Sequence, residues 1–518
     1  MVTPTANANK SALSIRLHAS DNVVIARQQL IGGTLLETEQ VQVQGLVPAA
    51  HKLATADIAR GQAVIRYGQI IGFASQPIQA GQHVHTHNLA MGEFEREHSV
   101  GIDAKPTDFI KEADAPSWQG IVRADGQVAT RNYLGVLTSV NCSATAARAI
   151  ADYFRRDTNP QALAEFPNVD GVIALTHGVG CGVDADSEAL AILRRTLSGY
   201  ARHPNFAAVL FVGLGCETNQ IGELFTQNGL QENARLRSFT IQDSGGTRKT
   251  VERGIAMVKD MLPAANAIQR QPLPIKHITV GLQCGGSDGY SGITANPALG
   301  AAMDILVRHG GSAILSETPE IYGAEHLLTR RASPQIAEKL MARVHWWEAY
   351  CTRMGAEMNN NPSSGNKAGG LTTILEKSLG AVAKAGSTNL VDVLEYAEPV
   401  KHKGLMFMDT PGYDPVSATG QVAGGANVIC FTTGRGSAYG CAPSPSLKLA
   451  SNTALWKRQE EDIDINCGDI ADGLASVEQL GQQIFDMILD VASGQKTKSE
   501  LHGYGQNEFV PWQIGATM

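Results

Sequence analysis

The chain has 518 residues, 43% of them apolar, and its 42 basic and 50 acidic residues leave a net charge of −8. This length exceeds one ordinary domain, so two or three are expected. The absence of a basic stripe argues against nucleic-acid binding, and no apolar run approaches the roughly 18 residues that cross a membrane. The N-terminal residues lack a secretory apolar core, so we expect a cytoplasmic protein whose eight cysteines are reduced.

The first part of the chain is predicted to form a small β-domain. Residues 1–11 are expected to form a disordered leader. Residues 12–90 contain short β-rich runs such as NVVIA and QAVIRYGQIIGFA, punctuated by glycine. Residues 91–117 have mixed charge, two prolines and little periodicity, which predicts a linker.

From residue 118 the pattern changes to that of an α/β protein. Strand-like apolar runs alternate with amphipathic stretches such as ATAARAIADYFRR, which predicts βαβ units and mainly parallel sheets. Proline and polar residues cluster at 264–276 and divide this part into domains at 118–270 and 271–518. The predicted fold class is α/β, with a small β-domain followed by two α/β domains.

Four apolar runs each end in a loop that carries a cysteine. Ligands of open α/β sheets bind beyond the carboxyl ends of the strands. A cysteine after a buried strand is often only a small core residue, but four in analogous positions favour a soft-metal or thiol-dependent site. We therefore expect one crevice to be lined by thiols, an imidazole and carboxylates: Cys142, Cys181, Cys216, Cys284, His177, Glu217 and Asp288.

Other glycine-rich loops carry further polar groups. Lys367 follows Asn366 in NPSSGNKAGG, and it either serves a site or is solvated. Arg435 lies between two glycines, a setting that suits binding of a carboxylate. Ser287 and Glu317 also follow strand-like runs. No loop matches GxxxxGK[ST] or gives a GxGxxG at the start of a helix, so no nucleotide is expected.

The β-domain contains a histidine-rich segment, QHVHTHNLA. On a strand, His83, His85 and His87 would share one face and could bind a transition metal. The alternative is a polar strand end with one useful histidine. His18 and His51 lie at other loop edges, where they could join the cluster or be solvated.

Several longer motifs carry a family resemblance. From His18 to the C-terminus the chain resembles the altronate and galactarate dehydratases, a family of sugar-acid dehydratases. The motifs are HASDNVVIA, HKLATADIARGQAVIRYGQIIG, HVHTHN followed by GEFERE, GQVATRNYLG, GLGCETNQ, QCGGSDGYSGITANPALG, NPSSGNKAGG and FTTGRGSAYG. Within the family, HVHTHN and GITANPALG are more similar to the altronate branch, whereas NCSATAARAIADYF differs from it.

The resemblance implies an N-terminal antifreeze-like (SAF) β-clip domain and two α/β domains. It also implies loss of water from an aldonate or aldarate to give a 2-keto-3-deoxy acid, and D-altronate is the expected substrate. The usual metal of the family is Fe²⁺. Mn²⁺ is one metal alternative; the other, suggested by the three or four cysteines on facing loops, is an iron–sulfur cluster. Galactarate dehydration, a sulfolactate sulfo-lyase activity and a non-enzymatic sugar-acid binding protein are the functional alternatives, and a homodimer is expected.

On this basis each candidate residue receives an expected role. The expected acid–base groups are His177, Lys367, Glu317 and His51. The expected substrate-binding groups are Arg435, Asn366, Ser287 and Asp288. The expected metal ligands are His18, His85, His87, Cys181, Cys216, Cys284 and Glu217.

Overall fold

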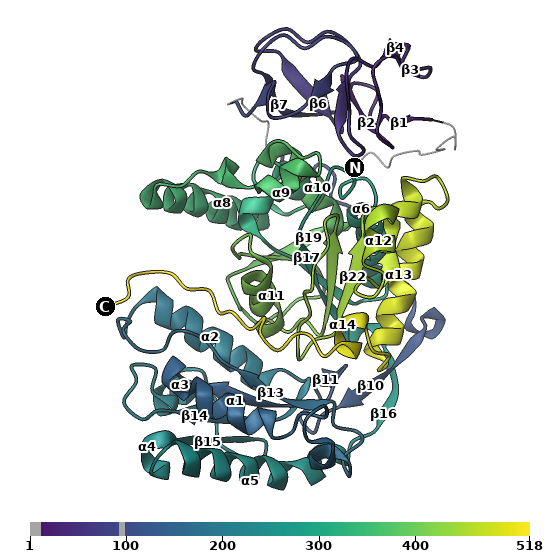
Figure 1. Cartoon of the computed structure of the whole chain (residues 1–518). Coiled ribbons are helices and arrows are strands. Elements are labelled where there is room, and N and C mark those ends of the chain that lie inside the picture. Colours follow the sequence, from purple (N-terminus) through teal and green to yellow (C-terminus); the bar gives the residue numbers. More distant parts are fainter. Residues whose placement is uncertain (1–11, 93–98) are drawn as a thin grey trace.

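The computed structural model describes residues 12–92 and 99–518 and confirms the predicted α/β fold class. The expected leader at 1–11 and residues 93–98 of the expected linker lie outside the described residues. Figure 1 shows the N-terminal β-domain on one end of the C-terminal α/β domain, and the second domain at the opposite end.

The N-terminal domain is built from short antiparallel strands. One sheet has the order β1-β2-β5-β8 and another the order β6-β7-β9, while β3 pairs with β4. The strands are β1 (Ser14–Ile15), β2 (Val23–Ala26), β3 (Leu35–Leu36), β4 (Val41–Gln42), β5 (Lys52–Ala54), β6 (Ala63–Arg66), β7 (Gln69–Ala74), β8 (His83–Val84) and β9 (Leu89–Ala90). Val24, Val47 and Leu53 are at most 1% exposed and belong to its core.

The next segment runs along the C-terminal domain. The Gly101 amide donates to the Thr329 carbonyl, and Asp103 pairs with Arg330. A three-stranded sheet β11-β10-β16 follows, formed by β10 (Ser117–Val122), β11 (Val128–Ala129) and β16 (Arg270–Pro274). The proline-containing stretch near 264–276 thus contains an edge strand, where missing amide donors are tolerated.

The second domain is a four-stranded parallel sheet of order β13-β12-β14-β15. Its strands are β12 (Tyr133–Thr138), β13 (Gly171–Leu175), β14 (Phe206–Gly213) and β15 (Leu236–Thr240). Its helices are α1 (Ala144–Asp152), α2 (Glu188–Arg202), α3 (Ile221–Gln227), α4 (Ile241–Ser244) and α5 (Thr247–Asn266). All eight residues of β14 are buried, as expected for a central parallel strand.

The C-terminal domain is a seven-stranded parallel sheet of order β19-β20-β18-β17-β21-β22-β23. The strands are β17 (Thr279–Cys284), β18 (Ser312–Leu315), β19 (Leu390–Leu394), β20 (Gly404–Met408), β21 (Val428–Thr433), β22 (Ser446–Ala450) and β23 (Ile465–Asn466). The helices are α6 (Ala295–Arg308), α7 (His326–Thr329), α8 (Pro334–Met354), α9 (Ser364–Ala368), α10 (Ile374–Val382), α11 (Asp414–Ala423), α12 (Thr453–Arg458), α13 (Val477–Ala492) and α14 (Lys498–Leu501).

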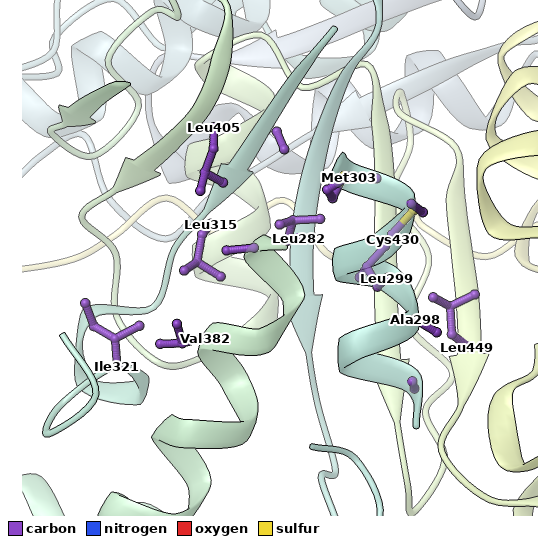
Figure 2. Close-up of a cluster of buried hydrophobic side chains, with 14 of the residues drawn as sticks. Leu282, Ala298, Leu299, Met303, Leu315, Ile321, Val382, Leu405, Cys430 and Leu449 are labelled. Atoms are coloured by element: carbon purple, nitrogen blue, oxygen red, sulfur yellow. The ribbon is translucent and has the colours of Figure 1, made fainter. Parts of the chain in front are cut away.

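The core of this domain lies between the sheet and helices α6 and α10. Figure 2 shows Leu282 of β17 and Leu315 of β18 facing Leu299 of α6 and Val382 of α10. Each of these side chains is at most 1% exposed. This packing fixes α10, which matters because α10 also contacts the N-terminal domain.

The second and C-terminal domains are in contact at several places. Helix α2 packs against α11 at Gly199, where a side chain would meet the Ala423 carbonyl oxygen at 2.3 Å. The C-terminal residues return to the second domain, and the Met518 amide donates to the Gly182 carbonyl at 2.8 Å. In residues 12–92 and 99–518, no helix combines the length and apolar character needed to cross a membrane.

Candidate active site

Buried ion pairs dock the N-terminal domain onto α10. Lys52 Nζ lies 2.9 Å from both carboxylate oxygens of Glu376, and Arg66 pairs with the same carboxylate. Lys52 and Arg66 also donate to the Gly370 and Gly289 carbonyls, each at 2.7 Å. Burial alone would raise the pKa of Glu376, but the two cations outweigh it and hold this pKa at about 2. Strands β5 and β6 are therefore anchored to the C-terminal domain.

Three imidazoles converge next to this anchor. Strand β5 pairs with β8, and this pairing brings His51 beside His83 and His85. His51 Nδ1 lies 2.9 Å from His83 Nε2, and one nitrogen from each of the three rings lies within 4.8 Å of the others. His85 Nδ1 is buried and has no hydrogen-bond partner. These three residues, called the imidazole group below, therefore offer converging ligand atoms.

The electrostatics of the imidazole group fit a transition metal. Burial is the main cause that lowers the pKa of His83 to about 3 and that of His85 to about 4, and it also lowers the pKa of His51. All three rings are therefore neutral near pH 7, the state in which imidazole coordinates metals. The orphaned His85 nitrogen is consistent with the same role.

The imidazole group faces loops of the C-terminal domain. His51 Nε2 lies 3.3 Å from the carbonyl oxygen of Ala368, the last residue of α9 and the neighbour of Lys367. Arg435 is exposed and close enough for its charge to contribute to the lowered His51 pKa. Lys367 is half-buried at the end of α9. The charge of Arg435 thus acts on the imidazole group, and Lys367 adjoins the residue that His51 contacts, so cationic groups are available near it for an anionic substrate.

Three of the predicted substrate-binding residues order these loops. Asn366 caps α9 through Ser363 and donates from Nδ2 to the Ser287 carbonyl at 2.9 Å. The Asp288 carboxylate accepts hydrogen bonds from Ser291, Ser451 and Asn452. The Asn366 and Asp288 side chains and the Ser287 carbonyl hold the loops together beside the interface.

A second cluster of polar groups is buried at the carboxyl ends of β17 and β18. Lys384 Nζ lies 2.8 Å from Cys284 Sγ and 3.4 Å from Glu317, and Lys377 Nζ lies 2.6 Å from Glu320. Cys284, Glu317 and Glu320 also form a group with metal-ligand spacing. Because two ammonium groups already lie against the ligand atoms of this group, we interpret the cluster as a proton-exchanging network.

The pKa values in this network diverge. Burial, reinforced by Glu320, raises the pKa of Glu317 well above its usual range. Burial followed by the Glu320 charge raises the pKa of Asp414, at the start of α11, to about 7. Burial opposes ionisation of Glu320 too, but Lys377 and Lys384 lower its pKa overall. Such divergence is typical of acid–base sites.

Helix α10 links the two clusters. It carries Glu376, which binds the N-terminal domain, and Lys377, which binds Glu320. A cavity of about 10 Å³, enough for about one water, lies between Tyr67 of the N-terminal domain and Lys377.

A larger cavity of about 410 Å³ lies elsewhere, between Tyr133 at the amino end of β12 and Glu500. It contains none of the predicted site residues.

The other two histidines predicted as ligands are not members of the imidazole group. His18 Nδ1 lies 2.7 Å from Ser20 Oγ in its own loop, and the ring packs against Gly68. His87 is exposed, with its ring centroid 5.5 Å from that of His83. Of the histidines predicted as ligands, only His85 belongs to the imidazole group, which His51 and His83 complete.

In the second domain, His177 is buried and both ring nitrogens contact the backbone, at Thr138 and Val179. Glu217 accepts hydrogen bonds from Ser139 Oγ and the Gly215 amide. Cys181 and Cys216 are exposed at the edge of this sheet, whereas Cys284 is buried in the other sheet. The expectation that all four strand-end cysteines face one crevice is therefore wrong for Cys284, because the chain forms two separate parallel sheets.

Sequence reasoning missed three groups of the buried network: Asp414, Lys377 and Lys384. A signal existed for the two lysines. They lie seven residues apart in the apolar stretch ILEKSLGAVAK, so they share a face of a buried helical segment. A lysine is almost never fully buried without a partner.

Comparisons with known proteins cover the same three regions. The model of the altronate/galactarate dehydratase SAF domain matches residues 12–92. The model of the second domain of D-galactarate dehydratase/altronate hydrolase matches residues 120–266. The C-terminal model of D-galactarate/altronate dehydratase matches residues 275–517.

Full-length relatives agree with these matches. The chain is 37% identical to a galactarate dehydratase (L-threo-forming) of Escherichia coli, over 94% of each chain. It is 35% identical to an altronate dehydratase of Escherichia coli and 33% identical to one of Bacillus subtilis, each over 97% of this chain and 99% of the relative. The beta subunit of a (2R)-sulfolactate sulfo-lyase of Chromohalobacter salexigens is 31% identical over 76% of this chain and 96% of the relative.

The fold, the docked SAF domain and these relatives define an enzyme of the hydro-lyase class, rather than a protein that only binds sugar acids. The chain belongs to the D-galactarate/altronate dehydratase family, which confirms the resemblance seen in its motifs. It is a sugar-acid dehydratase with a small-molecule substrate.

Proposed function

We propose that the protein is a metal-dependent dehydratase that converts D-altronate to the 2-keto-3-deoxy acid. The observation that carries this proposal is the convergence of three neutral imidazoles beside Lys367 and Arg435 at a docked domain interface. The HVHTHN motif supports altronate as the substrate, because it is more similar to the altronate branch of the family; it also contributes His83 and His85 to the imidazole group.

The reaction requires removal of a weakly acidic proton from C2, next to a carboxylate, and departure of the 3-hydroxyl. A divalent metal held by the imidazole group, Fe²⁺ or alternatively Mn²⁺, would supply Lewis-acid stabilisation of the charge that develops on the carboxylate side. Arg435 would bind the substrate carboxylate with its planar pair of donors. In this proposal His51 serves as a ligand and not as the acid–base group suggested by the sequence.

Proton transfer requires groups that exchange protons near neutral pH. Lys367, at the end of α9, is kept as the acid–base candidate that the sequence suggested. Asp414, with its pKa near 7, and Glu317, which is held protonated, are the candidates in the buried network. His177 is a weaker candidate than these, because backbone groups occupy both of its ring nitrogens.

Galactarate is the second candidate substrate. The chain is 37% identical to a galactarate dehydratase and 33–35% identical to altronate dehydratases. These identities support galactarate and altronate about equally. Sulfolactate is supported less, because the sulfo-lyase carries its α and β regions on separate subunits that match 13% and 76% of this chain.

The test is an anaerobic assay that measures formation of the 2-keto-3-deoxy acid in the presence of Fe²⁺ and a thiol. D-altronate and galactarate are assayed in parallel. Turnover of altronate in excess of galactarate is the expected result, and the opposite preference would select the second candidate. If the protein binds iron but dehydrates neither acid, the substrate proposal is wrong, and sulfolactate is the next acid to assay.

A further inference from the structure

Three thiols of the second domain are not used in the proposed function. Of the eight cysteines, all free, the exposed ones are Cys142, Cys181 and Cys216. Each follows a different strand, β12, β13 or β14, and these three strands are neighbours in one parallel sheet. Because parallel strands end at the same edge, the three thiols lie on loops of one edge.

Hydrogen bonds hold these three loops together. The Asn141 amide donates to the Val179 carbonyl, and the Asn219 amide donates to the Gly180 carbonyl, each at 3.0 Å. Asn219 Nδ2 also donates to the Ser139 carbonyl at 2.9 Å. Every cysteine of the group is within three residues of one of these bonds. The thiols are thus carried by one interlocked loop structure.

A buried carboxylate and the C-terminal residues hold the loops of this edge in place. Glu217, next to Cys216, accepts from Ser139 Oγ at 2.5 Å and from the Gly215 amide at 2.6 Å. The Met518 amide binds the Gly182 carbonyl beside Cys181, so the C-terminal residues pack against the same edge. The carboxylate and the chain terminus order the loops and leave the thiols exposed.

A single-ion site and a multi-iron cluster differ in how close their thiolates lie. A single four-coordinate ion with metal–sulfur bonds of about 2.3 Å keeps its sulfurs within about 4.6 Å of each other. The described residues include no group of these three cysteines with all sulfur atoms within 4.8 Å. A cluster of several metal ions, bridged by sulfide, spans a wider set of thiolates.

Two further features favour an anionic metal–sulfur centre. Gln242 Nε2 donates to Cys216 Sγ at 3.3 Å, and hydrogen bonds to sulfur are one of the means by which proteins tune such clusters. Helix α1 begins at Ala144, two residues after Cys142, so its partial positive N-terminus faces the edge.

We propose that Cys142, Cys181 and Cys216 bind a four-iron, four-sulfide cluster at this edge. Three thiolates leave one iron without a cysteine ligand, whereas a closed site of this kind has four. The open iron can accept an oxygen of water or of a hydroxy acid. Cys142 takes the place that the sequence suggested for Cys284. This site is separate from the imidazole group, and its existence does not rest on the proposed function.

The test is to purify the full chain anaerobically, reconstitute it with iron and sulfide, and measure iron, acid-labile sulfide and visible absorption. The expected result is nearly equimolar iron and sulfide with thiolate-to-iron absorption. Cys142→Ser, Cys181→Ser and Cys216→Ser should each lose most of both. Cys351→Ser, at a half-buried cysteine of α8, should keep both, and circular dichroism will show whether each variant is folded.

His83→Ala separates this proposal from the proposed function, because it should leave the iron–sulfide content unchanged. The inference is overturned if the reconstituted chain contains no sulfide, if it binds only a single ion such as zinc, or if two of the three cysteines form a disulfide. A cluster that survives in all three folded serine variants would overturn it as well.

Discussion

Glu376 is the side chain on which docking of the N-terminal domain most depends. Its carboxylate pairs with Lys52 and Arg66, and all three side chains are at most 1% exposed. Glu376→Leu would leave two buried cations without a partner. Removing one member of a buried ion pair costs about 3–5 kcal/mol, and full burial means that solvent screening does not reduce this cost.

This energy corresponds to a shift of roughly two to three and a half powers of ten toward the undocked state. Hydrogen exchange of β5 and α10, measured by mass spectrometry, detects such opening. The matched control is Glu395→Gln, which breaks an ion pair with Arg195 in which Glu395 is 57% exposed. A pair of this kind contributes less than about 1 kcal/mol, so protection should not change.

Replacing Lys52 and Arg66 by methionine together with Glu376→Leu should restore most of the protection, because an apolar triad carries no buried charge. Wild-type protection in the single Glu376→Leu variant would refute the reasoning. Failure of the triple variant to recover would show that the docking loss has another cause, such as altered packing.

Other predictions concern protonation and the buried network. Because the pKa of His83 falls to about 3 in the folded chain, the unfolded chain takes up its proton first as pH drops below about 6.5. Thermal stability should therefore decline from pH 6.5 to about 4, with a smaller decline in His83→Ala; equal slopes would contradict this. The pH–rate profile should contain a group near pH 7 that disappears in Asp414→Asn, and its persistence would assign it elsewhere. Lys377→Met should lower stability by about 3–5 kcal/mol because it leaves Glu320 unpaired, whereas Lys339→Met, at a 58% exposed side chain, should have little effect on the same melting curve.

The sequence predicts the elements of this fold better than their contacts. Strand ends at Cys181, Cys216 and Cys284 follow from apolar runs closed by glycine, and each run forms a strand. Runs of this kind are specified by local sequence alone. The expectation that His83, His85 and His87 share one face of a strand is wrong for the last two, because β8 ends at Val84, His85 lies in a bend and His87 in a turn.

Contacts between distant residues could not be predicted in the same way. Glu376 is separated by more than 300 residues from Lys52 and Arg66, and no local pattern pairs them. For the same reason the sequence could not show that backbone groups occupy both ring nitrogens of His177. Assigning Cys284 to the same crevice as the second-domain thiols required knowing that the parallel strands form two sheets.

The most direct test of the proposed metal centre is sugar-acid turnover as a function of Fe²⁺ concentration, in the wild-type protein and in His83→Ala. His18→Ala is the control, because His18 bonds within its own loop. We expect His83→Ala to lose turnover or to need at least ~10-fold more iron, with the control unchanged. Wild-type iron dependence in His83→Ala would contradict a metal centre at the imidazole group.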